Sequence, residues 1–161
     1  MMREMRKIKR KLSEADAYEL ISKAKEITIS MYDIEEGEPY AVIVNPIYLD
    51  NNIYIHCANE GRKIDVLRNN KKVCITAVIR SKVIESNYTT AYESVVINSS
   101  ASFIDNKDEK IEILNKLCDI FSPSQSKAMN NKIIEAEIDN TTIIKFPIES
   151  ISAKAHIRGK L

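Results

Sequence analysis

Alternating hydrophobic and polar residues predict β-strands over most of the chain. Ile27 to Asp33 (ITISMYD) alternates and is rich in β-branched residues. Tyr40 to Leu49 (YAVIVNPIYL) is almost continuously apolar, which is typical of a strand covered on both faces. Further strands are predicted at Ile53–Cys57, Val73–Ile79, Val95–Ile104 and Ile143–Ile151, the last with Ile144, Phe146 and Ile148 on one face. About six strands joined by short turns indicate one mainly β domain over residues 1–161, an antiparallel barrel that is closed or nearly closed.

Helical spacing of apolar residues marks the remaining segments. Ser13 is predicted to cap a first helix, whose apolar stripe is Ala17, Leu20, Ile21 and Ala24. A short helix is expected from Asn59 to Asn69. A longer one is expected from Asp105 to Phe121, with an inner face of Ile111, Leu114, Leu117, Cys118 and Phe121. Ser122-Pro123 ends this helix, and Ser124–Asn131 is predicted as a loop. Residues 133–138 fit no element clearly.

Composition narrows the class of protein without identifying it. The chain has 161 residues, of which 44% are hydrophobic and 29% charged, as in ordinary globular domains. The 24 basic and 23 acidic residues nearly balance, so we expect no nucleic-acid partner. No apolar run is long enough to span a membrane, and the amino terminus has no signal core. Three cysteines without a CxxC motif are typical of free thiols, so we expect a cytoplasmic protein.

The basic residues gather in the segment Met1 to Lys11 (MMREMRKIKRK), which has six basic residues and one acidic residue. Such an arm could bind nucleic acid or anionic lipid. No aromatic residues are interleaved with the charges, and the rest of the chain is mildly acidic. We therefore interpret this basic arm as a solvated lead-in to the first helix.

Three glycines exclude the glycine-rich phosphate loops of Rossmann and P-loop proteins. The two histidines, His56 and His156, lie far apart in the sequence, so no metal site is predicted. A cofactor would therefore need another kind of binding site.

The segment from His56 to Lys63 (HCANEGRK) carries the densest chemical signal. A strand ends there, Asn59 is a candidate cap, and Arg62 and Lys63 fall in the first turn of a helix. Cations oppose the helix dipole at this position unless an anion such as a phosphate lies over the free N–H groups. Gly61 would allow close approach of the ligand. The alternative is a pair of solvated cations on a surface turn.

His56 lies directly before this predicted anion site. A lone histidine is often a packed, hydrogen-bonded side chain, but beside an anion site it is also a candidate catalytic or cofactor-contacting residue. Cys57 points to the opposite face of the strand and is interpreted as a core residue.

Residues Gly37 to Asn70 resemble the FMN-binding split barrels of the pyridoxamine 5′-phosphate oxidase-like superfamily, and in particular its 5-nitroimidazole reductase branch. That branch reads G-x-PY-x-VP, then hydrophobic-YFH-x-A-x-x-G-x-K-hydrophobic-D. The segments YTTAYESVVINSSASFID (Tyr88 to Asp105) and IESISAKAH (Ile148 to His156) resemble two later strands of the branch. The resemblance spans nearly the whole chain and implies a six-stranded antiparallel split barrel with flanking helices.

The resemblance also implies a homodimer with an FMN in each of two clefts between the subunits. It implies that the flavin lies along Val42, Ile43, Val44, Asn45, Pro46 and Ile47, is contacted by His56 and Cys57, and is held at its phosphate by Arg62 and Lys63. Ser94 matches a position that reaches the flavin from the partner subunit. Two departures from the pattern are the shifted Pro46 and the stretch Asn98-Ser99-Ser100, which replaces a glycine and a lysine.

The expected function is an FMN-dependent oxidoreductase that takes electrons from a donor such as NAD(P)H and passes them to a nitroaromatic or related small acceptor, with His56 as the catalytic residue. One alternative is a non-catalytic flavin- or haem-binding module. Another is pyridoxamine phosphate oxidation, although the chain ends with a lone Arg158 where that activity needs an arginine-rich terminus.

Overall fold

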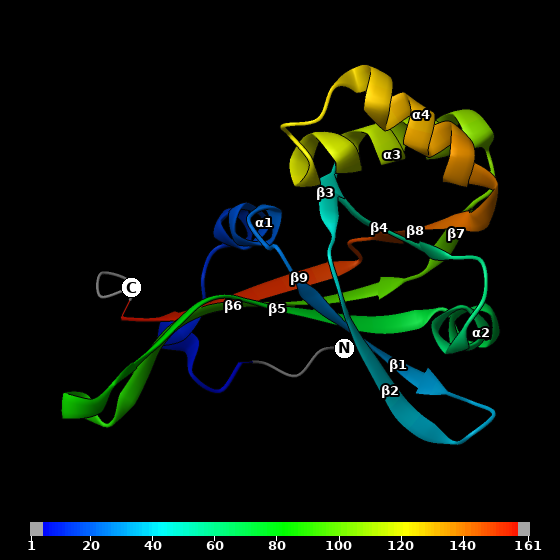
Figure 1. Cartoon of the computed structure of the whole chain (residues 1–161). Helices are drawn as coiled ribbons and strands as arrows, with labels where there is room; N and C mark the ends of the chain where they lie inside the picture. The colour runs from blue at the N-terminus through cyan, green and yellow to red at the C-terminus, as the bar shows by residue number, and fades with distance from the viewer. Residues whose placement is uncertain (1–4, 158–161) are drawn as a thin grey trace.

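The structure is a computed structural model that describes residues 5–157 (Figure 1). Its helices are α1 (Glu14–Ser22), α2 (Arg62–Asn69), α3 (Lys107–Phe121) and α4 (Lys127–Glu137), with the 3-10 helices η1 (Ile8–Arg10), η2 (Glu85–Asn87) and η3 (Ile138–Asn140). Its strands are β1 (Ile27–Asp33), β2 (Glu38–Val44), β3 (Ile47–Leu49), β4 (Asn52–Ala58), β5 (Lys72–Ile84), β6 (Thr89–Ser100), β7 (Ser102–Ile104), β8 (Thr141–Pro147) and β9 (Ser150–His156). Within this part of the chain no helix has the length and apolar character needed to cross a membrane.

The strands form two antiparallel sheets. The first has the order β2-β1-β5-β6-β9, and the second has the order β3-β4-β8-β7. The prediction of a mainly β, antiparallel fold with helices is confirmed, but the count of six strands is wrong. Residues 5–157 contain nine strands, and their hydrogen bonds leave two open sheets rather than one closed barrel.

The strand count rises because three predicted strands are each divided in two, over residues 40–49, 95–104 and 143–151. In each case the chain leaves one sheet and enters the other at the break. Pro46 and Pro147 lie at two of these breaks, and a proline has no N–H group with which to continue a ladder. Buried Ala101 lies at the third. Each of these three predicted strands is therefore two short strands, one in each sheet.

The prediction that the strand from Tyr40 is covered on both faces is also wrong. β2 is an edge strand with β1 as its neighbour in the sheet. Tyr40, Val42 and Val44 pack against the core, whereas the side chain of Ile43 points outward and is 71% exposed. The apolar run has one buried face in the single chain.

The main core lies between the two sheets, and α1 covers part of it. Phe146 and Ile144 of β8 and Ile29 of β1 are fully buried there. Ser13 caps α1 as predicted, because its Oγ accepts a hydrogen bond of 3.1 Å from the N–H of Asp16. The predicted stripe faces the core, with Ala17, Leu20 and Ile21 buried and Ala24 partly buried.

Helices α3 and α4 lie side by side over the second sheet (Figure 1). Leu117 is buried as predicted, but the predicted inner face is wrong at Phe121, which is 43% exposed, and it omits buried Ile113. The predicted loop over 124–131 is also wrong, because α4 begins at Lys127. Its cap is Ser126, whose Oγ accepts a 3.2 Å hydrogen bond from the N–H of Met129. The polar stretch before α4 (SPSQS, residues 122–126) concealed the start of this helix.

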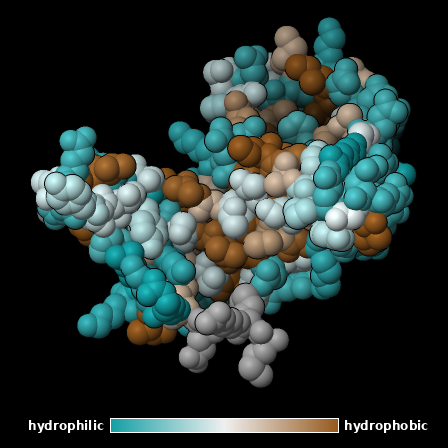
Figure 2. Space-filling view, turned by 90° about the horizontal axis from the view of Figure 1, so that it is seen from below, coloured by the Kyte–Doolittle hydropathy of each residue, from teal (hydrophilic) through white to brown (hydrophobic). Residues whose placement is uncertain are grey.

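The outer face of the five-stranded sheet carries exposed hydrophobic residues. Ile43, Val78 and Val96 are 71%, 69% and 40% exposed. Thr28 pairs with Ile43 and with Thr76 in the sheet, so small polar side chains separate these residues. Figure 2 views the molecule from this side and shows hydrophobic surface in the middle of the face. The face is partly apolar.

The basic arm lies next to β9 where the structure describes it, while its residues 1–4 lie outside the described residues. Lys11 forms an antiparallel bridge with Lys154, and the Leu12 N–H donates to the Ala153 carbonyl at 3.0 Å. These contacts attach the end of the arm to the first sheet, in agreement with its interpretation as a lead-in to α1.

Candidate functional site

The segment Val42–Ile47 joins the two sheets at the predicted flavin site. Val42 and Val44 point toward the core, Ile43 points outward, and Ile47 is buried. Asn45 and Pro46 lie between β2 and β3, outside either strand. The Asn45 side chain donates a 2.9 Å hydrogen bond to the carbonyl of Lys25, which fixes its orientation.

His56 and Cys57 occupy opposite faces of β4, as strand geometry requires. Cys57 packs against the core, which confirms its interpretation. His56 is an exposed residue, but desolvation by the atoms around it, and then the positive charge of Lys63, lower its pKa below the ordinary value. The imidazole is therefore neutral at pH 7 and can both donate and accept hydrogen bonds.

At the start of α2 the N–H groups of Ile64 and Asp65 donate to the Gly61 carbonyl at 2.8 and 3.2 Å, and within residues 5–157 no side chain caps those of Arg62 and Lys63. The prediction that Asn59 caps this helix is wrong: its side chain donates 2.7 Å to the Asp139 carbonyl and accepts 2.7 Å from the Thr142 hydroxyl. The N-cap is Gly61, with a φ of 118° and no side-chain cap. A Cβ at Gly61 would meet no protein atom within 4 Å, and the φ of 118° is a backbone angle that favours glycine.

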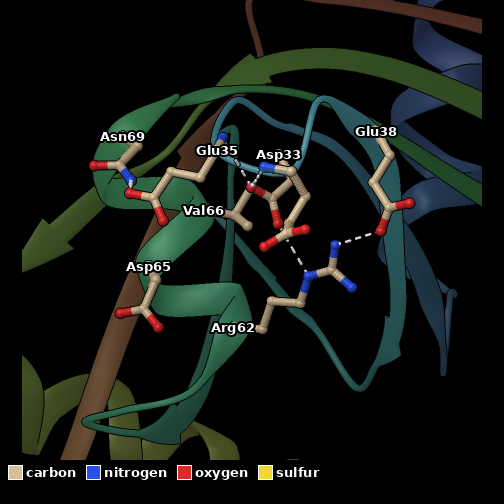
Figure 3. Close-up of a pocket in the computed structure, with 8 residues that line it drawn as sticks. Asp33, Glu35, Glu38, Arg62, Asp65, Val66 and Asn69 are labelled. Atoms are coloured by element: carbon tan, nitrogen blue, oxygen red, sulfur yellow. Dashed lines mark hydrogen bonds and ion pairs between the residues drawn. The ribbon is translucent and has the colours of Figure 1, made fainter.

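Arg62 is held by two carboxylates (Figure 3). Its Nε lies 3.0 Å from Oδ2 of Asp33, and its Nη2 lies 2.7 Å from Oε1 of Glu38. Its guanidinium also lies over the ring of Tyr40, 4.5 Å from the centroid. The hydrogen bonds to Glu38 and Asp33 raise the pKa of Arg62 further. Arg62 is therefore an exposed cation, with 43% of its side chain accessible, that is already paired with two carboxylates.

Lys63 has different surroundings. Its charge acts on His56 and on Cys57, where it opposes the burial that raises the pKa of the thiol. No ion pair of Lys63 with a carboxylate is found within residues 5–157. Lys63 has a side-chain hydrogen bond to Cys57 but no carboxylate partner among the described residues, so Lys63 and the N–H groups at positions 62 and 63 are the donors here that could hold the phosphate of a flavin.

A pocket of about 500 Å³ lies between α3, α4 and the end of β4. Asn45, His56 and Thr141 form its polar side together with Glu137. Its apolar side consists of Leu114, Leu117, Phe121, Ile133 and Ile134. This volume is typical of small-molecule sites, and we call it the apolar pocket. The sequence did not predict it, because the stripe on α3 was interpreted as core and α4 was missed.

A second hollow, of about 380 Å³, surrounds Arg62 between α2 and the β1–β2 hairpin (Figure 3). Five carboxylates line it, from Asp33, Glu35, Glu36, Glu38 and Asp65. We call it the acidic hollow. No local pattern in the sequence joined these residues to Arg62, because the pairing depends on how the β1–β2 hairpin packs against α2.

Ser94 lies apart from these residues in the single chain. It is on β6, in the first sheet, paired with Val78 and Lys154. Its side chain shares the outer face with Val96. The structure thus brings Asn45 and His56 together in one pocket and places Lys63 near His56, while Ser94 belongs to a different surface.

Comparisons with known proteins agree with this architecture. A sequence profile described as pyridoxamine 5′-phosphate oxidase matches residues 13–155, so the chain belongs to the pyridoxamine 5′-phosphate oxidase family. No curated protein matches the sequence.

Solved structures share the split-barrel fold of this family. One is a candidate 5-nitroimidazole antibiotic resistance protein from Bacteroides thetaiotaomicron VPI-5482, with a TM-score of 0.74 and 24% identity over 89% of this chain and 85% of that one. Another is the flavocytochrome Anf3 from Azotobacter vinelandii, with a TM-score of 0.75 and 18% identity over 95% and 72%. A third is a FAD and heme binding protein from Mycobacterium smegmatis, with a TM-score of 0.72 and 16% identity over 90% and 72%. At these identities the likeness shows the fold alone.

Proposed function

We propose that this protein is an FMN-dependent oxidoreductase that passes electrons to a nitroaromatic or related small acceptor. One observation supports it most: His56 lines the apolar pocket and also feels the charge of Lys63, which belongs to the uncapped first turn of α2. This arrangement offers hydrogen-bond donors for the phosphate of FMN. It also offers a neutral histidine beside a cavity that could hold the ring of an acceptor.

The bound FMN would supply the electron transfer, and the protein would supply placement and polarity. Lys63 and the N–H groups of α2 hold the phosphate. The segment Val42–Ile47 lies along the ring, with Asn45 and His56 at its edge. His56 donates a hydrogen bond to the acceptor or to the flavin from a neutral ring. The predicted contact of Cys57 with the flavin would use its backbone, because its side chain packs against the core.

The acceptor would occupy the apolar pocket. Glu137 is the charged residue among those that line it, and no cation lines it. A phosphorylated substrate such as pyridoxamine phosphate would find no counter-ion there. A neutral, planar ring is favoured because the apolar side chains of α3 and α4 gain by its burial.

We propose a cytoplasmic homodimer, with NAD(P)H or a similar donor as the reductant. Ile43, Val78 and Val96 on the outer face would be covered by the second subunit, since exposed apolar patches on such faces mark interaction surfaces. Ser94 shares this face and would reach the flavin of the partner subunit from it. In such a dimer the second subunit would also cover the exposed outer side of β2.

The absorption spectrum of the purified protein, followed by titration with FMN, tests this proposal. A yellow spectrum that NAD(P)H bleaches and a nitroaromatic restores is expected. Bleaching without turnover would favour a non-catalytic flavin-binding module. A sharp Soret band would favour haem, a candidate because two proteins of the same fold are named as a flavocytochrome and a heme binding protein.

A further inference from the structure

A second, smaller pocket adjoins the apolar pocket at the corner between β2 and β3. Its volume is about 160 Å³, and we call it the corner pocket. It is lined by the segment 22–25 at the end of α1, by Pro46 and the start of β3, and by Ile120 and Phe121 of α3. Phe121 also lines the apolar pocket, and within residues 5–157 it is the residue that the two pockets share. Phe121 therefore lies at the boundary between them.

The chain between β2 and β3 forms the other side of this boundary. Asn45 lines the apolar pocket, and the next residue, Pro46, lines the corner pocket. The hydrogen bond from the Asn45 side chain to the carbonyl of Lys25 ties this turn to the segment before β1. Because the turn is held by its backbone and by this bond, Phe121 is the part of the boundary that a single side-chain substitution can remove.

The end of α3 holds the backbone of Phe121 in place. Phe121 is the last residue of the helix, and the N–H of Ser122 donates to the carbonyl of Cys118 at 2.8 Å. One turn earlier, buried Leu117 belongs to the same hydrophobic cluster as Ile47 of β3. Phe121 itself is 43% exposed. Its replacement removes little of the core, so we expect variants at this position to fold.

The corner pocket suits an alkyl substituent better than a whole ligand. About 160 Å³ is below the usual range for a small-molecule site. Pro46, Ile47 and Ile120 give it an apolar side next to Phe121. An alkyl chain that enters it from the apolar pocket would gain by burial against these side chains. In the wild-type protein the side chain of Phe121 stands in its way.

We propose that Phe121 is the residue that limits the length of the acceptor. This inference rests on the proposed function, in which the acceptor occupies the apolar pocket. A neutral aromatic ring with a short substituent fits on one side of Phe121. A longer alkyl substituent directed past Asn45 meets Phe121 before it reaches the corner pocket. Phe121 is thus a specificity-determining residue that takes no part in electron transfer.

The test is the binding of the methyl, propyl and pentyl esters of 4-nitrobenzoic acid to the oxidised full-length protein, measured by isothermal titration calorimetry without a reductant. These esters are neutral nitroaromatic rings that differ in the length of one alkyl chain. The wild-type protein is expected to bind the pentyl ester no more tightly than the methyl ester. In Phe121→Ala the ratio of the two affinities should rise, by up to about fourfold for each methylene group that enters the corner pocket.

Ile120→Ala is the matched control. Ile120 precedes Phe121 in α3, is 57% exposed, and lines the corner pocket but not the apolar pocket. Its replacement enlarges the corner pocket and leaves Phe121 in place, so the ratio should stay at its wild-type value. Phe121→Leu keeps a smaller apolar side chain at the boundary and should give an intermediate ratio. If Phe121→Ala fails to fold, Phe121→Leu replaces it in the test.

The results distinguish this role of Phe121 from the proposed function. A ratio that rises in Phe121→Ala alone supports the role. An unchanged ratio overturns it even if the protein is yellow and reduces nitroaromatics, and so does an equal rise in Ile120→Ala. Wild-type protein that binds none of the esters overturns it together with the place of the acceptor. Protein that binds the esters but no flavin contradicts the proposed function, while a ratio that rises in Phe121→Ala still supports the limit on ligand length.

Discussion

The acidic hollow and the apolar pocket share no lining residue, and they differ in what they can bind. The acidic hollow is lined by five carboxylates and one guanidinium, and the guanidinium is paired with two of the carboxylates. The apolar pocket is lined by hydrophobic side chains with a neutral histidine at one end. Arg62 is paired with Asp33 and Glu38, whereas Lys63 has no carboxylate partner among the described residues. Two cations that are adjacent in the sequence can therefore have different partners in the fold, and the net charge of a site cannot be read from such a pair.

The largest effect on stability is expected at the wall of the apolar pocket. Ile134 and Ile133 both line it from α4, but Ile134 is 5% exposed and Ile133 is 53% exposed. Ile134→Ala should lower the free energy of unfolding by about 2–5 kcal/mol, because it leaves a cavity beneath α4. Ile133→Ala should change it by less than about 0.5 kcal/mol. Urea unfolding measures both, and equal losses would contradict the position of α4.

Filling the apolar pocket should affect the acceptor rather than the flavin. Leu114 is partly buried and lines the pocket from α3. Leu114→Trp should raise the KM for a nitroaromatic acceptor about tenfold or more, which corresponds to about 1.4 kcal/mol of lost binding. The affinity for FMN should stay at its wild-type value. A lower FMN affinity with unchanged KM would place the flavin ring, rather than the acceptor, in the pocket.

The acidic hollow should make stability depend on pH through Asp33. Burial raises its pKa, but hydrogen bonds from the Glu36 N–H and from Arg62 outweigh this effect, so the pKa lies below its ordinary value of 3.8. A depressed carboxyl pKa stabilises the fold at pH values above 3.8, and this contribution is lost as pH falls through the folded-state pKa. Asp33→Asn should therefore be less stable than wild type at pH 7, with a smaller difference at pH 3.

Glu36→Gln is the matched control for Asp33→Asn, because Glu36 is an exposed carboxylate of the same hollow. It should show no such convergence in urea unfolding at the two pH values. A difference between Asp33→Asn and wild type that is the same at pH 7 and pH 3 would contradict the role given to Asp33.

The smallest expected effect is on the titration of His56. Desolvation by the atoms around it is the larger cause of its low pKa and Lys63 the smaller. Lys63→Met should therefore raise the pKa of His56 only part of the way to 6.5. NMR titration of the imidazole protons measures it. His156, whose Nε2 lies 3.2 Å from Nη2 of Arg10, serves as the internal reference and should not shift.

Local sequence patterns predicted most of the elements but not the way in which they pack. The alternation from Ile27 to Asp33 and the cap at Ser13 were enough for β1 and the start of α1, because short-range spacing determines both. The corner at Pro46 was not predicted, since an apolar run looks the same whether one strand or two bury it. The partners of Arg62 were missed because Asp33 is 29 residues away. Long-range pairing of charges has no local signature.

The candidate site, like the fold, was predicted only in part. The sequence and its family resemblance pointed to His56 and Lys63, which the structure brings near each other. They did not point to the wall formed by Leu114 and Ile134, because amphipathic spacing is the same for a helix that covers a core and for one that lines a cavity.

Chemical-shift mapping by ¹⁵N NMR during titration of the protein with FMN tests the central claim most directly. The account predicts saturable shifts of the amide signals of Lys63, His56 and Asn45. It predicts little change for Glu35, Asp65 and Asn69 in the acidic hollow. The largest shifts at those three residues, or shifts that do not saturate, would contradict it.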